Sequence, residues 1–315
     1  MTGRKLHGST VTVFGAGGFI GANVCTALSA AGAEIRGFGR PSKFLDLNTP
    51  TRWFEAEFGD VSAMRDAVDG ADFVVHLLGG SNPGLYNSSP THEILGNTIP
   101  SLELLKTCQA AGVNRIIFLS SGGTVYGPGV ATPTDENAST NPISAYGIGK
   151  LTVEKYLGLF HHLFGLDYRI LRVSNPYGPF QAPERGQGFV AHAMQRAIDN
   201  EPIQIWGDGK VIRDYVYIAD VADAIVKSIL HVGDHKVFNI GSNKGLTLLD
   251  VVYSIERTLN VPTKLEFHDA RPADIPVSIL DINRARIGMG WKPSTDWFVA
   301  LKMTRDWLLS YRSLK

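Results

Sequence analysis

Residues 10–31 read TVTVFGAGGFIGANVCTALSAA and decide the fold of this 315-residue chain. The β-branched run 10–14 predicts a strand, the glycines after it predict a tight turn, and the alanine-rich stretch 22–31 predicts a helix. Val24, Leu28 and Ala31 fall at helical spacing within that stretch. A second strand is predicted at 33–38, so the helix between the two strands carries the chain back to the same end of a parallel sheet.

The alternation of strand and helix continues as far as residue 172. Further strands are predicted at 73–77, 115–119 and 168–172, and further helices near 62–68, 101–111 and 145–164. This order is typical of an α/β domain with a doubly wound parallel sheet of the Rossmann type.

After about Ser174 the pattern changes to loops rich in proline and glycine, as at 175–179, 206–209 and 268–276, with short helices between them. We expect a smaller α/β domain here that faces a substrate. Residues 215–230 are then predicted as a helix and 237–240 as a strand, so the two domains should interleave. The predicted division gives 1–174 and about 212–242 to the first domain, and 175–211 and 243–315 to the second.

The composition excludes several function classes. Lys and Arg number 30, as do Asp and Glu, so the net charge is zero and the chain lacks the basic field that attracts nucleic acid or an anionic membrane. Cys25 and Cys108 have no ligand spacing and are expected to be buried thiols in a reducing compartment. No apolar run approaches the roughly 20 residues of a membrane span. Because the polar start is also unlike a signal peptide, we expect a cytoplasmic protein.

Gly15, Gly18 and Gly21 form a GxxGxxG pattern between the first strand and the first helix. Glycine at such positions lets backbone N–H groups and the helix N-terminus approach a pyrophosphate. A lone glycine triplet is weak evidence, and its alternative is a turn that merely packs helix on strand. Its position directly after the first strand favours a dinucleotide site.

The end of the second strand carries Gly39-Arg40. An acidic residue there would accept from both ribose hydroxyls of NAD, whereas an arginine pairs with the 2′-phosphate of NADP or stacks on adenine, so the choice between the two cofactors stays open. Asp60-Val61 stands where the third strand should lead into its helix, and Asp60 is predicted either to meet the adenine or to cap that helix.

Tyr146 and Lys150 stand four residues apart in a predicted helix, which places them on one face. A lysine cation near the phenol, with a positive nicotinamide ring beside it, favours the phenolate and lowers the pKa of Tyr146 from ~10 toward neutral, giving a general base. The alternative is a surface pair of no function. The glycine turn upstream and the serine-rich strand end Ser120-Ser121-Gly-Gly-Thr124 favour the catalytic interpretation.

Several motifs, taken together, resemble the extended short-chain dehydrogenase/reductase family over nearly the whole chain: 15–21, 119–127, 141–146, 171–178, 213–216 and 271–274. Within that family the chain is similar to the NAD-dependent nucleotide-sugar epimerases and dehydratases, and most similar to the UDP-glucose 4-epimerases. The resemblance implies redox-neutral C4 epimerisation of UDP-glucose and UDP-galactose. In it, Tyr146 takes a proton from a sugar hydroxyl as hydride passes to NAD, and Lys150 holds the nicotinamide ribose. A transient 4-keto sugar then turns over and takes the hydride back on its other face.

The resemblance also implies where the cofactor is held. Its contacts would be made by Gly15, Gly18, Phe19, Ile20, Gly21, Arg40, Asp60, Val61, Leu78, Gly79, Asn97, Ser120, Tyr146, Lys150 and Ser174.

One position departs from the family pattern. A Ser or Thr that follows the Ser-Ser pair shuttles the proton to the tyrosine in the family, but this chain has Gly122 there. We expect Ser121 or Thr124 to take over. Family dehydratases carry Thr-Asp-Glu at this point, and Gly122-Gly123-Thr124 lacks that acid pair, which argues against 4,6-dehydration.

The resemblance further assigns substrate contacts, beside those of Thr124 and Tyr146. Asn175 would approach the diphosphate, Arg213 and Arg271 would neutralise the phosphates, and Gly188, Phe189 and Val190 would lie beside the uracil. An arginine fork matches phosphate oxygens, although either arginine alone could be a solvated surface charge. Ser278 aligns with the residue that gates the far side of the sugar. Since serine leaves room for an N-acetyl group, we expect UDP-GlcNAc and UDP-GalNAc to be accepted as well.

No metal site is expected. His231 and His235 stand four apart without a third ligand, and His76 lies in an apolar run typical of the core. The helices at 101–111 and 145–164 carry apolar residues beyond what one sheet face requires, which predicts a homodimer through a helix bundle as in relatives. The surplus residues are Leu102, Leu105, Cys108, Leu151, Leu157, Phe160 and Phe164.

Two other functions compete with the epimerase. Arg40 favours an NAD(P)-dependent nucleotide-sugar reductase, decarboxylase or dehydratase of the same fold. A non-catalytic dinucleotide-binding regulator is the third possibility, against which Tyr146 and Lys150 argue, because a pure binder needs no base beside the nicotinamide. The physiological sugar and its pathway stay open at this point, as does whether the cofactor leaves between turnovers.

Overall fold

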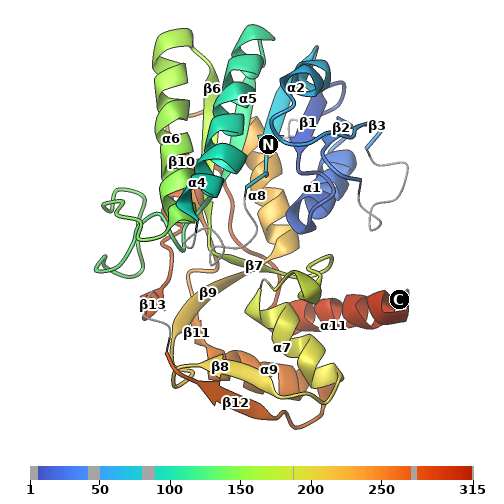
Figure 1. Ribbon diagram of the computed structural model, residues 1–315, viewed down its shortest axis with the longest axis vertical. Helices are drawn as coiled ribbons and strands as arrows, with labels where there is room; N and C mark the ends of the chain where they lie inside the picture. Colours follow the sequence, from blue (N-terminus) through green and yellow to red (C-terminus); the bar gives the residue numbers. More distant parts are fainter. Residues whose placement is uncertain (1–5, 42–49, 80–88, 187, 271–274, 314–315) are drawn as a thin grey trace.

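A seven-stranded parallel sheet forms the centre of the upper part of the molecule in Figure 1, with strand order β10-β6-β5-β4-β1-β2-β3. The computed structural model describes residues 6–41, 50–79, 89–186, 188–270 and 275–313. The sheet strands are β1 (Thr10–Phe14), β2 (Glu34–Phe38), β3 (Arg52–Phe54), β4 (Phe73–His76), β5 (Arg115–Ser121), β6 (Asp167–Val173) and β10 (Val237–Ile240). The predicted doubly wound α/β fold is confirmed.

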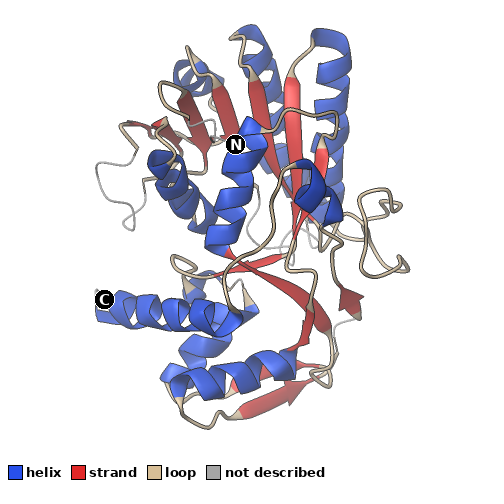
Figure 2. Cartoon of the chain, turned by 180° about the vertical axis from the view of Figure 1, so that it is seen from behind, coloured by secondary structure: helices blue, strands red, loops and turns tan. Residues whose placement is uncertain are grey.

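Helices cover both faces of this sheet (Figures 1 and 2). On one face α1 (Phe19–Ala30) packs against α8 (Ile218–Leu230). On the other, α2 (Val61–Val68), α5 (Ile99–Ala110) and α6 (Ala145–Phe164) pack side by side. A short helix α4 (Pro90–Glu93) and a π-helical turn η1 (Ile94–Thr98) lead into α5. Among the described helices, none combines the length and the apolar character needed to cross a membrane.

Alternating strand residues explain the two layers. Val11 and Val13 of β1 belong to the cluster that contains Val24 of α1, whereas Phe14 belongs to the cluster that contains Met64 of α2. Successive side chains of a strand point to opposite faces of a sheet. The apolar strands of this sheet are therefore buried on both sides, as parallel strands usually are.

The second part of the chain folds below the carboxyl ends of the central strands (Figure 1). Its sheets are β11-β9-β13, with β7 beside β9, and the pair β12-β8. Its strands are β7 (Asn175–Tyr177), β8 (Ile203–Trp206), β9 (Ile212–Tyr217), β11 (Gly245–Thr247), β12 (Leu265–His268) and β13 (Val277–Ser278), and its helices are η2 (Pro183–Arg185), α7 (Phe189–Ile198), α9 (Leu248–Leu259), α10 (Asn283–Gly288) and α11 (Trp297–Ser313). We expected loops with short helices in this part of the chain, and the sequence pattern did not reveal these strands.

One predicted helix boundary was wrong. Residues 215–217 belong to strand β9, and α8 begins at Ile218 rather than at Tyr215. Tyr215, Val216 and Tyr217 are all buried, and an apolar run that continues into a helix does not reveal by its pattern where strand ends and helix begins. Residues 212–217 pair with β7, β11 and β13 of the second part, whereas β10 pairs with β6 of the central sheet.

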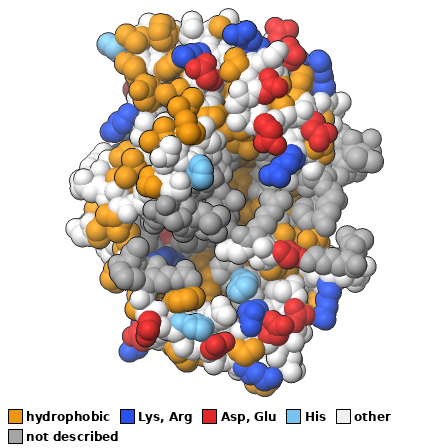
Figure 3. Space-filling view, viewed as in Figure 1, with side chains coloured by type: hydrophobic (Ala, Val, Ile, Leu, Met, Phe, Trp, Pro, Cys, Tyr) orange, Lys and Arg blue, Asp and Glu red, His pale blue; other side chains and the backbone are white. Residues whose placement is uncertain are grey.

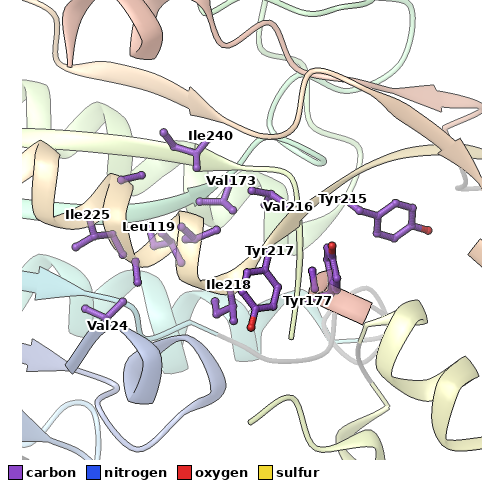
Figure 4. Packing of buried hydrophobic residues seen from close by; sticks show 14 of the residues in the cluster. Val24, Leu119, Val173, Tyr177, Tyr215, Val216, Tyr217, Ile218, Ile225 and Ile240 are labelled. Atoms are coloured by element: carbon purple, nitrogen blue, oxygen red, sulfur yellow. The ribbon is translucent and has the colours of Figure 1, made fainter. Parts of the chain in front are cut away.

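The two parts share one apolar core. Figure 4 shows Val24, Leu119 and Ile225 of the central sheet and its helices in one cluster with Tyr177 and Tyr217 of the second part. The rings of Tyr177 and Tyr217 meet edge to face, with centroids 5.8 Å apart. Because this contact is continuous, the second part is held firmly against the carboxyl edge of the sheet, where parallel α/β proteins bind their ligands.

Candidate active site

The turn after β1 has the geometry of a phosphate cradle. Gly15 has φ +90°, and a Cβ atom on Gly21 would lie 2.1 Å from the Gly15 carbonyl oxygen, so both positions require glycine. Gly18 precedes α1 and offers no side-chain cap. The N–H groups of the first helical turn, which includes Phe19 and Ile20, are left for a ligand, and a helix N-terminus suits a pyrophosphate.

The structure distinguishes between the two roles predicted for Asp60, a helix cap and a contact with adenine. Asp60 caps α2, because its side chain accepts from the backbone N–H of Ala63 at 3.0 Å, so the predicted helix cap is confirmed. Its contact with adenine stays a prediction, as does that of Val61, the first residue of the helix. Arg40 is exposed just after Gly39, whose carbonyl accepts from the Trp53 indole at 2.7 Å.

Helix α6 carries Tyr146 and Lys150 on one face, at the carboxyl ends of the central strands. Ser144 begins the helix by accepting from the N–H of Gly147 at 3.1 Å. The Lys150 ammonium donates to the carbonyls of Leu119 at 2.9 Å and of Leu78 at 3.4 Å. It lies 5.8 Å from the Tyr146 ring centroid. The lysine therefore joins the ends of β4 and β5 beside the phenol.

Gly79 completes this junction. A Cβ atom at Gly79 would lie 2.7 Å from the Lys150 Nζ. Only glycine leaves the lysine in place, so Leu78 and Gly79 shape the floor on which a nicotinamide ribose is expected to rest.

Ser121 and Thr124 both lie near the start of α6, but of the two only Ser121 affects the pKa of Tyr146. The Ser121 hydroxyl lies close enough to the Tyr146 phenol to lower the pKa of that phenol. The Thr124 carbonyl faces Gly147, and its hydroxyl is buried without a hydrogen-bond partner among the described residues. Of the two expected replacements for the residue missing at Gly122, the geometry favours Ser121 as the proton shuttle.

The protein groups alone do not activate the phenol. Burial and the negative charge of Glu93 raise the pKa of Tyr146 to about 12, against a smaller lowering by Ser121. Burial lowers the pKa of Lys150 to about 8, which Glu93 and Glu154 partly oppose. The expected fall in the Tyr146 pKa is thus not found in the protein by itself, and it depends on the charge of the nicotinamide ring that the prediction placed beside it.

A buried polar network supports the site, and sequence reasoning missed it. Glu154, one turn after Lys150, pairs with Arg172 of β6 at 2.6 Å, and both side chains are buried. Glu154 also accepts from the Ser120 hydroxyl at 2.5 Å. The Arg172 guanidinium lies over the Tyr126 ring, 4.9 Å from its centroid. Since the Ser120 hydroxyl donates to Glu154 in this network, any cofactor contact at Ser120 would be made by its backbone atoms.

Asn97 and Ser174, two of the predicted cofactor contacts, each form a side-chain hydrogen bond within the protein. Asn97 is held on η1, where its amide donates to Glu93 at 2.8 Å. Ser174 follows β6, and its hydroxyl donates to Asp214 at 3.3 Å. Asp214 also accepts from the N–H of Ser242 at 2.6 Å. This buried carboxylate therefore ties the central sheet to the second part.

Three of the predicted substrate residues lie on strands of the second part. Arg213 and Ser278 are direct partners in the pairing of β9 with β13, and the Arg213 guanidinium donates to the carbonyl of Ile275 at 2.6 Å. The Asn175 amide donates to the carbonyl of Asp214 at 2.8 Å. The structure thus brings Asn175, Arg213 and Ser278 onto adjacent strands.

The predicted uracil contacts begin another element. Gly188, with φ +84°, precedes α7, and a Cβ atom there would lie 2.2 Å from the Gln181 amide nitrogen. Phe189 and Val190 form the first turn of α7, with Val190 buried. Arg271 lies outside the described residues.

The remaining candidates are structural. His76 is fully buried at the end of β4, as expected, and Cys25 and Cys108 are buried free thiols. His231 follows the end of α8 and His235 is exposed. Over the described ranges, no group of three or more His, Cys, Asp or Glu side chains could hold a metal ion.

The predicted association surface needs correction. Leu105, Cys108, Leu157 and Phe160 are buried beneath their helices rather than being surplus apolar residues. These side chains pack against the central sheet, as the period of an amphipathic helix allows. Of the residues named for the bundle, Phe164 is exposed.

Comparison with known proteins finds a matching family and relatives that cover most of the chain. The NAD dependent epimerase/dehydratase family matches residues 11–241. A UDP-glucose 4-epimerase from Mycolicibacterium smegmatis is 32% identical over 291 residues, 89% of this chain and 92% of that protein. A dTDP-4-dehydro-6-deoxyglucose reductase from Escherichia coli is 29% identical over 293 residues, 90% of this chain and 92% of that protein.

Two solved structures superimpose over nearly the whole chain. A UDP-glucose 4-epimerase from Thermotoga maritima, solved with UDP-glucose, gives a TM-score of 0.91 at 32% identity, covering 97% of this chain and 100% of that one. A UDP-N-acetylglucosamine 4-epimerase from Methanobrevibacter ruminantium, in complex with UDP-N-acetylmuramic acid, gives 0.90 at 28% identity, covering 97% and 99%.

Proposed function

The chain belongs to the NAD-dependent epimerase/dehydratase family, and on that premise we propose that it interconverts UDP-hexoses that differ in configuration at C4. The observation that carries the proposal is the placement of Tyr146, Lys150 and Ser121 at the carboxyl edge of the sheet, beside the glycine cradle. A base and its proton relay next to a dinucleotide site suit the reversible oxidation of a secondary alcohol.

The cradle of Gly15, Gly18 and Gly21 fits the pyrophosphate of NAD, the cofactor of this family. When bound, this cofactor would supply the hydride acceptor for C4 of the sugar and the hydride donor for the opposite face of the same carbon. In this proposal the Lys150 ammonium, which donates to the carbonyls at two strand ends, holds the nicotinamide ribose and favours the phenolate of Tyr146.

The protein residues move the proton. The Tyr146 phenolate takes the proton of the C4 hydroxyl through the Ser121 hydroxyl, so that a 4-keto sugar forms. After the sugar turns over, Tyr146 returns the proton by the same route, and the substrate and product have the same oxidation state. Arg213 and Asn175 hold the diphosphate meanwhile, so that only the hexose changes its orientation.

The short side chain of Ser278 is the reason to propose acetamido substrates as well as UDP-glucose. Ser278 lies beside Arg213 at the edge of the small sheet and is partly exposed. Its short side chain leaves the space that an N-acetyl group at C2 needs. We therefore include UDP-GlcNAc and UDP-GalNAc in the proposed substrate class.

Sugar NMR tests the proposal directly. Purified protein is incubated with UDP-glucose and, separately, with UDP-GlcNAc without added reductant, and the anomeric protons are followed. Appearance of the galacto epimer is the expected result. A Tyr146→Phe variant should keep its cofactor and lose about 10²- to 10⁴-fold in rate. Failure of both substrates to convert in protein with bound cofactor would overturn the proposal.

A reductase is the second candidate, supported by Arg40 and by the reductase relative. Arg40 is exposed where the adenosine ribose is expected, and its guanidinium suits a 2′-phosphate. A reductase consumes reduced cofactor in proportion to product, whereas an epimerase does not. Net oxidation of NADPH with a 4-keto nucleotide sugar would identify it.

We also propose that the protein is a homodimer through the outer faces of α6 and the segment from η1 into α5. Figure 3 shows apolar side chains gathered over these helices at the upper left. The exposed members of this apolar face are Ile94, Leu95, Ile99, Ile143, Ile148, Tyr156, Leu159, Leu163 and Phe164. An apolar surface of this extent is unusual for a monomer, and a two-fold axis would bury the same face on both copies.

A further inference from the structure

Glu93 is a buried acid beside the catalytic pair that the proposed reaction does not use. It ends α4 with only 4% of its surface exposed, and its carboxylate accepts from the Asn97 amide at 2.8 Å. Burial raises the pKa of its carboxyl, while Asn97 and the Lys150 ammonium oppose that rise. Burying a carboxylate costs free energy. The position of this one beside Tyr146 and Lys150 therefore suggests that it has a function there.

The backbone around Glu93 is irregular in a way that fixes its side chain. Residues Ile94–Thr98 form a π-helical turn, and such turns concentrate at functional sites. Pro100 explains the turn, because it lacks the N–H that an α-helix would give to the carbonyl of Gly96. The Ser101 hydroxyl donates to the Asn97 carbonyl at 2.6 Å. Helix α5 is thereby anchored immediately after the Glu93–Asn97 pair.

Ser101 also joins this segment to the central sheet. Its oxygen lies 2.9 Å from the Nε2 of His76 at the end of β4. Since the Ser101 proton goes to Asn97, the His76 Nε2 donates. Burial and the Lys150 charge hold the pKa of His76 well below its usual range, so His76 orders the segment as a neutral ring.

The Glu93 carboxylate lies against helix α6 at Gly149. A Cβ atom built on Gly149 would lie 2.3 Å from the Glu93 Oε1. The carboxylate therefore rests directly on the helix backbone, next to Lys150 and one turn from Tyr146. Any side chain at position 149 would force it away.

Charge balance shows what the carboxylate does there. The buried carboxylates whose charge raises the pKa of Lys150 are Glu93 from α4 and Glu154 from α6, and His76 from β4 is neutral. Glu154 is engaged by Arg172 of β6 at 2.6 Å and by Ser120. Glu93 is then the carboxylate whose charge is left to balance the lysine.

We propose that Glu93 is a positioning residue of the catalytic site, whose buried carboxylate keeps Lys150 charged and holds Asn97 in place through the π-helical turn. The inference rests on the proposed function for the reaction that it serves. Glu93 touches no reacting atom. It acts through Lys150, whose cation must be present for Tyr146 to work as a base, and through Asn97, which is expected to contact the cofactor.

The first test reads Lys150 directly, without substrate or cofactor. Protein labelled with ¹³C at the lysine Cε is titrated by NMR, and Lys150→Arg assigns the signal. We expect a midpoint near the pKa of about 8 in the parent, and a clearly lower midpoint in Glu93→Gln, because the amide keeps the shape and removes the charge. Glu103→Gln is the matched control. Glu103 pairs with Lys106 on the surface, where solvent and salt screen its charge. The Lys150 midpoint should therefore be the same in Glu103→Gln as in the parent.

The second test uses the pH dependence of turnover. The acidic limb follows deprotonation of Tyr146, and the basic limb follows deprotonation of Lys150. Removing a negative charge lowers both pKa values, so both limbs should move to lower pH in Glu93→Gln. A residue with a merely structural role would lower the rate at every pH without moving the limbs.

Gly149→Ala keeps Glu93 and displaces it, which provides a test if Glu93→Gln does not fold. Alanine has a higher helix propensity than glycine, so a weaker helix cannot explain an effect of this substitution. We expect the Lys150 midpoint to be lower in Gly149→Ala, as in Glu93→Gln. An unchanged Lys150 midpoint in folded Glu93→Gln or Gly149→Ala would overturn the inference. Because this titration needs no substrate, it is decisive even if the parent protein shows no epimerase activity.

Discussion

A Cβ atom built on Gly122 would lie 2.5 Å from the Cδ1 of Leu280, so the Leu280 side chain occupies the space that a serine at position 122 would need. Leu280 is 1% exposed and packs with Val125 and Tyr126 of the same loop. The absence of a hydroxyl at Gly122 is therefore built into the packing of the chain. The proton relay must come from a neighbour, and the Ser121 hydroxyl is the one that lowers the pKa of Tyr146.

Ser121→Ala should lower the turnover rate by about 10²- to 10³-fold, because it removes the hydroxyl between Tyr146 and the sugar. Thr124→Val serves as the matched control and should lose less than about tenfold, since its hydroxyl makes no hydrogen bond among the described residues. Steady-state rates with saturating UDP-sugar measure both. The reverse order of effects would assign the relay to Thr124.

Gly122→Ser should destabilise the protein by about 1–3 kcal/mol through overpacking against Leu280. Leu280→Ala leaves a cavity and should cost about 2–5 kcal/mol. In the double variant the new side chain fills part of that cavity, so the loss should be smaller than the sum by about 1 kcal/mol. Urea unfolding of the four proteins measures this coupling, and strict additivity would contradict the contact.

The catalytic helix was predictable because its signals are local. Ser144 caps it, Gly165 ends it with φ +74°, and Tyr146 and Lys150 share a face through a spacing of four. The network around it was not predictable, because Arg172 sits within an apolar strand and meets Glu154 only after the sheet has formed. The position of Glu154, one turn after Lys150, was the one available signal. The small strands were missed because two to six residues carry too little periodicity.

Ser278→Tyr should abolish conversion of UDP-GlcNAc while leaving that of UDP-glucose within about tenfold. A bulky ring beside Arg213 would fill the space that the N-acetyl group needs, whereas a C2 hydroxyl is small enough to remain. The kcat/KM values for the two sugars measure the change. Ser278→Ala controls for the lost hydroxyl and should keep both activities, and equal loss of both sugars in the tyrosine variant would contradict gating.

Leu163→Glu should convert the proposed homodimer into a monomer. Leu163 is 57% exposed on the apolar face, in the last turn of α6, and a carboxylate there would be buried unpaired in a two-fold interface. Sedimentation velocity at several protein concentrations measures the change. Ile287→Glu, at an apolar residue of α10 that is 76% exposed, should leave the dimer intact. A parent protein that sediments as a monomer throughout would disprove the interface.

Asp167 predicts how stability depends on pH. Its carboxylate, at the amino end of β6, meets Arg115 at 2.7 Å, Arg169 at 2.8 Å and Lys236 at 2.6 Å. These cations hold the pKa of Asp167 well below its usual range, despite partial burial. Because the pKa is about 3.9 in the unfolded chain, the carboxylate stabilises the fold fully above that pH. This stabilisation is lost as the pH falls through the lower folded-state pKa.

Asp167→Asn should therefore lower the free energy of unfolding by about 2–3 kcal/mol at neutral pH, where three charge-assisted contacts lose their acceptor charge. The variant should also lose less stability than the parent between about pH 5 and pH 2, since it has no proton to take up at this site. Asp199→Asn, whose partner Arg312 is largely exposed, should cost less than about 1 kcal/mol. Thermal unfolding across this pH range measures the stability of all three proteins. If stability falls with pH by the same amount in Asp167→Asn as in the parent, the cations do not shift the pKa of Asp167.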